Sequence, residues 1–206
     1  MDAVDKLTEL FKEFPGIGER QARRFVYFLM ARNSNYSENL STLIKELKKE
    51  ISQCHECFRF FPLKNKENTG GLCNICRDPH TDTSLLMVVE KDSDLESIRK
   101  SGAYTGKYFI LGGLVPIVEK TTPSRVRINE LLERVTDKKR NIKEIVLAFT
   151  ISPQGDHTDF YIRSQLKNTA TELGIKISSL GRGLSTGTEL EYSDNDTIKN
   201  ALKNRS

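Results

Sequence analysis

Two kinds of hydrophobic pattern divide this chain, and the division falls near residue 84. Before that point, apolar residues recur at intervals of three and four, which is typical of amphipathic helices. After it, short continuous apolar runs alternate with helical stretches, which is typical of a buried parallel sheet with helices on its faces. The pattern therefore predicts a helical N-terminal region followed by an α/β region.

Three helices are predicted in the N-terminal region. A stripe predicts the first over residues 3–13, before Pro15-Gly16-Ile17-Gly18 ends it; its members are Val4, Leu7, Phe11 and Phe14. The second follows Gly18, with a stripe made of Ala22, Phe25, Val26, Leu29 and Met30. The third is predicted over 38–53 and leads directly into Cys54; its stripe is Leu40, Leu43, Ile44, Leu47 and Ile51.

The second helix carries a basic face. Polar positions displaced by two residues from the apolar stripe, about 200° around the helix, are Arg20, Arg23, Arg24 and Tyr27. The turn and this helix resemble a helix-hairpin-helix motif, in which turn glycines let backbone N–H groups approach a DNA phosphate and nearby arginines neutralise others. The predicted DNA-binding residues are Gly16, Gly18, Arg20, Arg23 and Arg24. The alternative is an αα-hairpin with a solvated arginine face.

All four cysteines lie between positions 54 and 76, as Cys54-x2-Cys57 and Cys73-x2-Cys76 with fifteen residues between the pairs. Two such pairs supply a tetrahedral shell of thiolates, and a full cysteine shell leaves no open position for water. The spacing therefore predicts one structural zinc ion per chain. A disulfide is disfavoured inside cells, and a redox Cys-x-x-Cys explains one pair but not two. Nearby polar residues are predicted to lie at the surface: His55, Asp78 and His80.

The α/β region should contain four strands and three helices. The strands are predicted at 84–90, 108–112, 144–149 and 176–180, and the helices at about 93–100, 124–135 and 157–173. Glu90 ends the first strand and 152–157 follow the third, where ligands of such sheets bind. The glycine-rich stretch 181–194 is predicted to be a packing or subunit-joining loop. A last helix is expected over 196–206, with Ile198 and Leu202 facing inward.

A strand ending in glutamate, with an acidic loop after a later strand, resembles the Toprim fold of topoisomerases, primases and some nucleases. Catalytic members carry Asp-x-Asp in that loop, whereas this chain has Thr150 and Ser152 there. Only Glu90 and Asp156 remain of the acidic set, so Mg²⁺ binding is expected to be weak at most and no catalytic residue is predicted. The alternatives are a Mg²⁺-dependent nuclease or primase-like enzyme, and a zinc-ribbon transcription adaptor that leaves the α/β region unexplained.

Composition limits the function only weakly. The 206 residues include 32 Lys and Arg against 28 Asp and Glu, and this net charge of +4 permits nucleic-acid binding without requiring it. No apolar run reaches about 18 residues, so no membrane span is predicted. The acidic start, Met1-Asp2-Ala3-Val4-Asp5, lacks the features of a signal peptide, which predicts a cytoplasmic protein.

The order of these parts resembles the RecR family of bacterial recombination mediators. The most specific pieces, besides the cysteines, are Phe14-Pro-Gly-Ile-Gly18, Leu86-Met-Val-Val-Glu90, Gly106-Lys-Tyr-Phe-Ile-Leu-Gly112 and Gly187-Thr-Glu-Leu-Glu-Tyr192. The resemblance implies repair of gapped DNA, in which RecO and in many bacteria RecF help to load RecA onto single-stranded DNA. It also implies a ring-like homotetramer that can encircle DNA.

The resemblance also assigns residues. It places DNA contacts at Arg20 and Arg24, zinc at the four cysteines, and RecO contacts at Glu90 and the acidic loop that contains Asp156. RecR proteins usually carry Glu-Gly-Glu in that loop, whereas this chain has Gln154-Gly155-Asp156.

The predicted fold class is therefore α+β and multi-modular. The expected modules are a helix-hairpin-helix at 1–53, a four-cysteine zinc module at 54–80, a Toprim-like domain with a mostly parallel sheet at 81–180, and a C-terminal strand/helix segment at 181–206 for assembly. Because a helix is predicted to lead directly into Cys54, the zinc module is predicted to join the hairpin to the α/β region.

Overall fold

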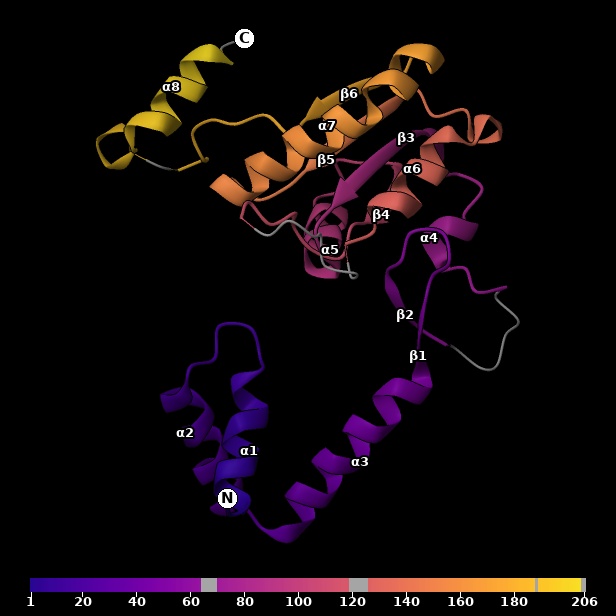
Figure 1. Cartoon of the computed structure of the whole chain (residues 1–206). Helices are drawn as coiled ribbons and strands as arrows, with labels where there is room; N and C mark the ends of the chain where they lie inside the picture. The colour runs from indigo at the N-terminus through magenta and orange to yellow at the C-terminus, as the bar shows by residue number, and fades with distance from the viewer. Residues whose placement is uncertain (64–69, 119–125, 188, 205–206) are drawn as a thin grey trace. The chain divides into compact units, whose positions relative to one another are not determined.

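Figure 1 shows a computed structural model of the protein, which describes residues 1–63, 70–118, 126–187 and 189–204. The chain forms two compact units. One contains Met1–Ser52 and a short stretch that begins at Pro62, and the other contains Gln53–Phe61 and the described residues from Gly70 onward. Several positions named above lie outside the described residues: 124–125 of a predicted helix, Thr188 of the motif that ends at Tyr192, and 205–206 of the last predicted helix.

The first unit begins with two packed helices, α1 (Ala3–Lys12) and α2 (Glu19–Met30). Their seam holds the rings of Phe11 and Phe25, whose centroids lie 5.8 Å apart, and the buried Val26. The buried stripe of α2 is narrower than predicted, since Met30 is 64% exposed. Two helices bury only the seam between them, so the outer positions of a predicted stripe remain in solvent.

The third helix, α3 (Ser34–Glu50), begins earlier and ends earlier than predicted. Asn33 caps its start by accepting a hydrogen bond from the Tyr36 N–H at 3.0 Å. The last predicted residues form instead the strand β1 (Ile51–Gln53), which pairs with β2 (Phe60–Pro62). The prediction that a helix leads directly into Cys54 is therefore wrong. A two-stranded ribbon satisfies the backbone groups of these residues in place of another helical turn.

A four-stranded parallel sheet is the centre of the second unit, in the order β4-β3-β5-β6. The strands are β3 (Asp82–Val89), β4 (Gly106–Ile110), β5 (Glu144–Ala148) and β6 (Lys176–Ser179). All four match the predicted strands to within about two residues. The register places Val88 of β3 beside Phe109 on one side and Leu147 on the other.

Helices connect the strands and cover both faces of the sheet. They are α5 (Asp92–Ser101), α6 (Ile128–Thr136) and α7 (Pro153–Leu173), together with the short α4 (Asn74–Arg77) and η1 (Lys138–Arg140). Alternate residues of β3 point to opposite faces: Val88 joins the core beneath α6 and α7, and Val89 joins the core with Leu95 of α5.

Helix α7 begins four residues before the predicted position. Ser152 caps it by accepting a hydrogen bond from the Gly155 N–H at 3.1 Å, and Pro153 follows in the first turn. Asp156 therefore lies in a helix rather than in the predicted loop. Helix α6 conversely begins at Ile128, so Val126 and Arg127 of the predicted helix are not helical.

The C-terminal segment contains η2 (Leu190–Tyr192) and α8 (Asn195–Lys203), and its described residues form no strand. Asp194 caps α8 by accepting from the Thr197 N–H at 2.9 Å. Ile198 is half-buried, but Leu202 is 59% exposed, so the inward orientation predicted for it is wrong. Within the described ranges, no helix has the length and apolar character needed to cross a membrane.

Candidate metal centre and nucleic-acid interface

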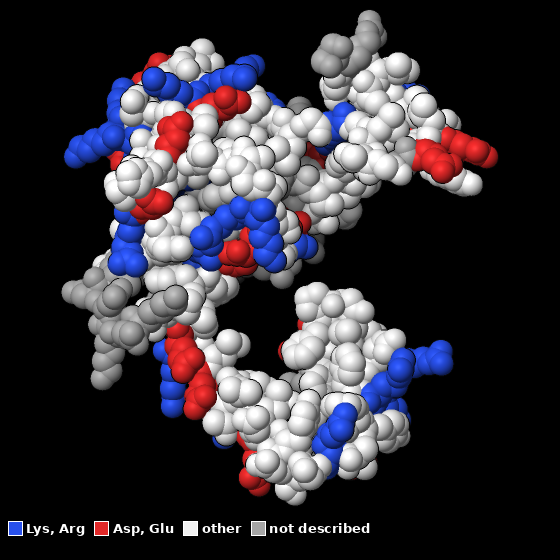
Figure 2. Space-filling model, turned by 180° about the vertical axis from the view of Figure 1, so that it is seen from behind, with Lys and Arg blue, Asp and Glu red and all other residues white. Residues whose placement is uncertain are grey.

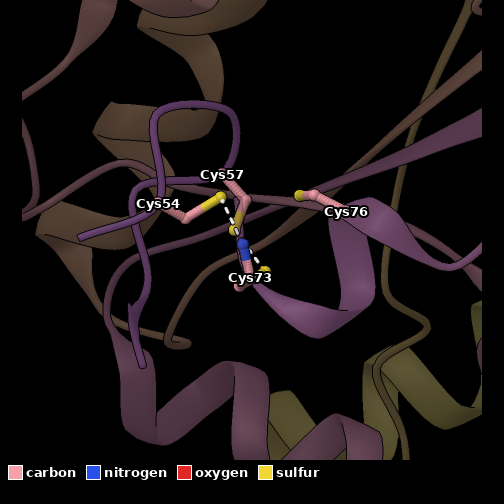
Figure 3. Close-up of side chains that lie close together, drawn as sticks. All are labelled: Cys54, Cys57, Cys73 and Cys76. Carbon is pink, nitrogen blue, oxygen red and sulfur yellow. Dashed lines mark hydrogen bonds between the residues drawn. The ribbon is translucent and has the colours of Figure 1, made fainter. Parts of the chain in front are cut away.

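The four cysteine side chains converge on one point (Figure 3). Their sulfur atoms lie within 4.8 Å of one another, and across the part of the chain that the structure describes this is the one such group of three or more Cys, His, Asp or Glu side chains. The sulfurs of Cys57 and Cys73 are 3.6 Å apart. A tetrahedral zinc–thiolate shell with bonds of about 2.3 Å separates its sulfurs by about 3.8 Å. The cluster can therefore bind a metal ion.

The cysteine sulfurs are shielded from solvent and hydrogen-bonded to one another and to the backbone. Cys54, Cys57 and Cys73 are fully buried, whereas Cys76 is half-buried. The hydrogen bond between Cys54 and Cys57 lowers the pKa of the Cys54 thiol and raises the pKa of the Cys57 thiol. The thiolate is the metal-binding form of cysteine. The backbone N–H of Cys73 also donates to the Cys54 sulfur at 3.4 Å, which orients that ligand.

The first cysteine pair lies in a tight turn. The Phe58 N–H donates to the Cys54 carbonyl, and the Cys54 N–H donates to the Arg59 carbonyl, both at 2.9 Å. Phe58 adopts a φ of 61°, a left-handed conformation that costs a non-glycine residue about 1–2 kcal/mol. Its ring lies 5.3 Å from the Phe109 ring and 4.9 Å from the guanidinium of Arg127. These contacts within the second unit, called the sheet unit from here on, offset the strain.

Gly71 permits the approach of the second cysteine pair to the first. It has a φ of 74°, and a Cβ at this position would lie 2.4 Å from the imidazole of His55. Its carbonyl accepts a hydrogen bond from the His55 N–H at 3.0 Å. A side chain here would hold a strained backbone conformation and would require the His55 imidazole to move. His55 itself is exposed, as are Asp78 and His80.

Two residues of the edge strand β4 attach the cysteine segments to the sheet. The ammonium of Lys107 donates to the carbonyls of Ile75, Cys76 and Asp78 at 3.0, 3.2 and 3.3 Å. The Ile110 N–H donates to the carbonyl of Cys57 at 2.9 Å. The metal centre thus belongs to the same compact unit as the sheet, where the sequence predicted a joint between two regions.

An ion-pair network lies beside the first cysteine pair. The carboxylate of Glu56 accepts from Arg140 Nη2 at 2.9 Å and also contacts Nη1 of that residue. The guanidinium of Arg134 lies 3.8 Å from the same carboxylate and donates to the Glu56 carbonyl. The hydrogen bond from Arg140 lowers the pKa of Glu56, and burial lowers the pKa of Arg134. A buried guanidinium needs a nearby anion, and Glu56 supplies it.

The turn between α1 and α2 has the geometry that the sequence predicts. The Ile17 N–H donates to the Phe14 carbonyl at 3.0 Å, and Gly16 has a φ of 77°. Proline followed by such a glycine is typical of a type II turn. Gly18 begins α2 without a side-chain cap, and nothing lies within 4 Å of a Cβ built on either glycine. Gly18 therefore offers no side-chain acceptor to the first-turn N–H groups of α2.

The three predicted arginines meet on one exposed face of α2. Arg20, Arg23, Arg24 and Tyr27 line a shallow hollow of about 460 Å³ together with Glu19. The opposite side of the helix holds the buried Ala22 and Val26. Glu19 lies 3.7 Å from Arg23, whereas Arg20 and Arg24 have no acidic partner in the described part of the chain. Figure 2 shows Lys and Arg side chains projecting from this hairpin.

The two acidic residues predicted as a partner site follow the two central strands. Glu90 comes directly after β3 and is half-buried, while Asp156 lies in the first turn of α7, after β5. The guanidinium of Arg182 contacts the Asp156 carboxylate. The chain passes from β3 to β4 on one side of β3 and then to β5 on its other side. Glu90 and Asp156 therefore lie at the carboxyl ends of the strands on either side of this reversal, where such sheets bind ligands.

The usual metal-binding loop of catalytic Toprim proteins serves another purpose here. Ser152 caps α7, and the Thr150 carbonyl would lie 2.0 Å from a Cβ on Gly155. The loop is thus packed as a helix start that requires glycine at 155. The described residues bring no third carboxylate or histidine ligand to Glu90 and Asp156. The donor set for a two-metal site is therefore incomplete.

Comparison with known proteins identifies the family. A family model for the Toprim domain matches residues 84–180. Along nearly the whole chain the sequence is similar to proteins named recombination protein RecR. The protein of Amoebophilus asiaticus is 36% identical over 204 residues, which cover 99% of this chain and 94% of that protein.

This chain belongs to the RecR family. The RecR of Dehalococcoides mccartyi is also 36% identical, over 98% of this chain and 93% of its own, and that of Legionella pneumophila is 33% identical over 100% and 96%. The predicted family and α+β fold class are confirmed, with a Toprim domain, an all-parallel sheet and a four-cysteine cluster.

Four residues that support the metal centre were missed in the sequence: Glu56, Lys107, Arg134 and Arg140. Glu56 and Lys107 carry a partial signal, since one lies between the first two cysteines and the other in the motif Gly106-Lys-Tyr-Phe-Ile-Leu-Gly112. Arg134 and Arg140 carry none, because their contacts to Glu56 span 78 and 84 residues along the chain.

Proposed function

We propose that this protein is a recombination mediator of the RecR type, which binds DNA without sequence preference during repair of gapped DNA. It acts with RecO, and with RecF where the host has it, in loading RecA onto single-stranded DNA. It does so as a ring-like homo-oligomer and not as an enzyme. Family membership over the whole chain supports this role.

The observation that carries DNA binding is the arginine face of α2. Three guanidinium groups converge on one hollow next to an uncapped helix start, and two of them have no competing carboxylate among the described side chains. Helix starts and arginines both bind phosphate oxygens, and such contacts carry no base information. We assign DNA contacts to Arg20, Arg23 and Arg24 and to the backbone at Gly16 and Gly18.

The test is the double variant Arg20→Ala/Arg24→Ala. Affinity for oligonucleotides of unrelated sequence should fall by a similar factor for each, and the slope of log affinity against log salt should decrease by roughly 0.7–0.9 per lost phosphate contact. Lys45→Ala/Lys48→Ala is the matched control, because it removes two exposed charges from α3 of the same unit. Equal binding by both double variants would refute the assignment.

We assign zinc as the metal of the cysteine cluster, one ion per chain, with a structural role. Four thiolates suit Zn²⁺ and leave no position for a substrate. Elemental analysis of the purified protein tests this assignment. A stoichiometry well below one zinc per chain in a protein purified without chelators would contradict it.

We further propose that Glu90 and Asp156 contribute to the RecO contact. Both lie at the carboxyl edge of the sheet, although Asp156 is also bound by Arg182. Glu90→Gln should weaken co-elution with RecO in size-exclusion chromatography while leaving DNA binding intact. The rival Toprim nuclease or primase would require Mg²⁺-dependent nicking of plasmid DNA that Glu90→Gln abolishes, and the incomplete donor set argues against it.

A further inference from the structure

A second group of basic side chains lies beside the metal centre, within the sheet unit. A cavity of about 430 Å³ opens there between the second cysteine pair and η1. Its basic lining consists of Arg77, Lys107, Arg134, Lys139 and Arg140. Against these five cations the lining offers two carboxylates, Glu56 and Asp78. The cavity is therefore positively charged and comes from chain segments unrelated to α2.

Structural contacts account for three of the five cations. Lys107 donates its three hydrogen bonds to backbone carbonyls of the second cysteine pair. Arg134 and Arg140 both contact Glu56. The remaining two, Arg77 at the end of α4 and Lys139 in η1, are exposed and have no acidic partner in the ranges that the structure describes. Two free cations from separate elements thus meet at one cavity.

The metal centre lowers the positive charge of this cavity without cancelling it. A divalent ion held by four thiolates carries a formal charge of about −2, and Cys76 lines the cavity. With Glu56 and Asp78 this makes four negative charges against five cations, so one positive charge remains uncompensated.

We propose that this cavity binds a phosphate group of a nucleic-acid strand, with Arg77 and Lys139 as its exposed contacts. The inference rests on the proposed DNA-binding function and adds a second contact, on the unit that holds the sheet. Arginine and lysine are the usual partners of backbone phosphates, and a cavity of this size accommodates a phosphate with part of its sugar. This contact would carry no sequence preference.

The test compares Arg77→Ala/Lys139→Ala with wild type and with Lys138→Ala/Lys199→Ala in the full-length, metal-loaded protein. The control also removes two charges, because Lys138 and Lys199 are exposed, pair with Glu172 and Asp196, and lie outside the cavity. Fluorescence anisotropy with a labelled oligonucleotide should show roughly five- to tenfold weaker binding for the cavity variant at low salt. Its salt slope should fall by about 0.7 per lost phosphate contact on a single strand.

Separate readouts keep the outcomes distinct. Equal zinc content and melting temperature in all three proteins establish that the cavity variant is folded. If Arg20→Ala/Arg24→Ala weakens binding but Arg77→Ala/Lys139→Ala binds like its control, the cavity inference is wrong and the proposed function stands. If inorganic phosphate binds the cavity by ³¹P NMR while oligonucleotide affinity is unchanged in the variant, the site takes free phosphate and the inference is also overturned.

Discussion

Replacing Lys107 with methionine removes three hydrogen-bond donors from the metal centre and keeps a side chain of similar length. The carbonyls of Ile75, Cys76 and Asp78 lose the ammonium that holds them against β4. A hydrogen bond to a charged group contributes roughly 1.5–3 kcal/mol when it is buried. Lys107 is half-buried and water can reach part of the site, so we expect a total loss of about 2 kcal/mol rather than the sum of three bonds.

That loss corresponds to about 30-fold weaker metal binding, within the 10–100-fold range typical of residues that orient metal ligands. Competition with a chromophoric zinc chelator at fixed pH measures it directly. Lys100→Met is the matched control, because Lys100 is an exposed lysine of α5 in the same unit. If Lys107→Met retains zinc as tightly as Lys100→Met, the lysine does not hold the second cysteine pair and the reasoning fails.

Three further predictions test the supporting contacts. Cys73→Ser should lose zinc and unfold the sheet unit before DNA binding by the hairpin is affected, and a stable metal-free variant would contradict this. Glu56→Gln should lower stability by about 1–2 kcal/mol at neutral pH, less than a fully buried pair. Since the pKa of Glu56 is lowered on folding, this difference is complete above the ordinary value of 4.5 and disappears as pH falls through the folded-state value. Urea unfolding across the acid range measures it, and a constant difference would refute the ion pair. Ser152→Ala should cost about 1 kcal/mol through loss of the α7 cap, measured by thermal unfolding against Ser164→Ala on the same helix.

The sequence predicts the sheet because a buried parallel strand is a local signal. Four apolar runs flanked by helical stretches locate β3 to β6 to within about two residues. The cysteine spacing likewise predicts the cluster, since two Cys-x-x-Cys turns have few other uses. The arginine face of α2 follows from helical periodicity alone.

The failures share a physical cause, which is competition from contacts distant in sequence. Ile51 continues the apolar stripe of α3, yet pairing of β1 with β2 takes the backbone out of the helix. Asp156 is the exception, because a local cap at Ser152 starts α7 before its apolar stripe begins, and the apolar pattern alone predicts a loop there. Arg134 is a charged residue on a helix by pattern, and only the position of Glu56 in the fold explains its burial.

The attachment of the cysteine segments to β4 also covers part of the open edge of the sheet. β4 is a terminal strand, and the Ile110 N–H that faces away from β3 is taken by the Cys57 carbonyl. Uncovered strand margins recruit other chains and start aggregation. Metal release would loosen the Cys57 turn and uncover Ile110. The thiolate cluster thus hinders self-association through β4. Protein treated with a chelator should form β-rich aggregates sooner than protein that retains its zinc.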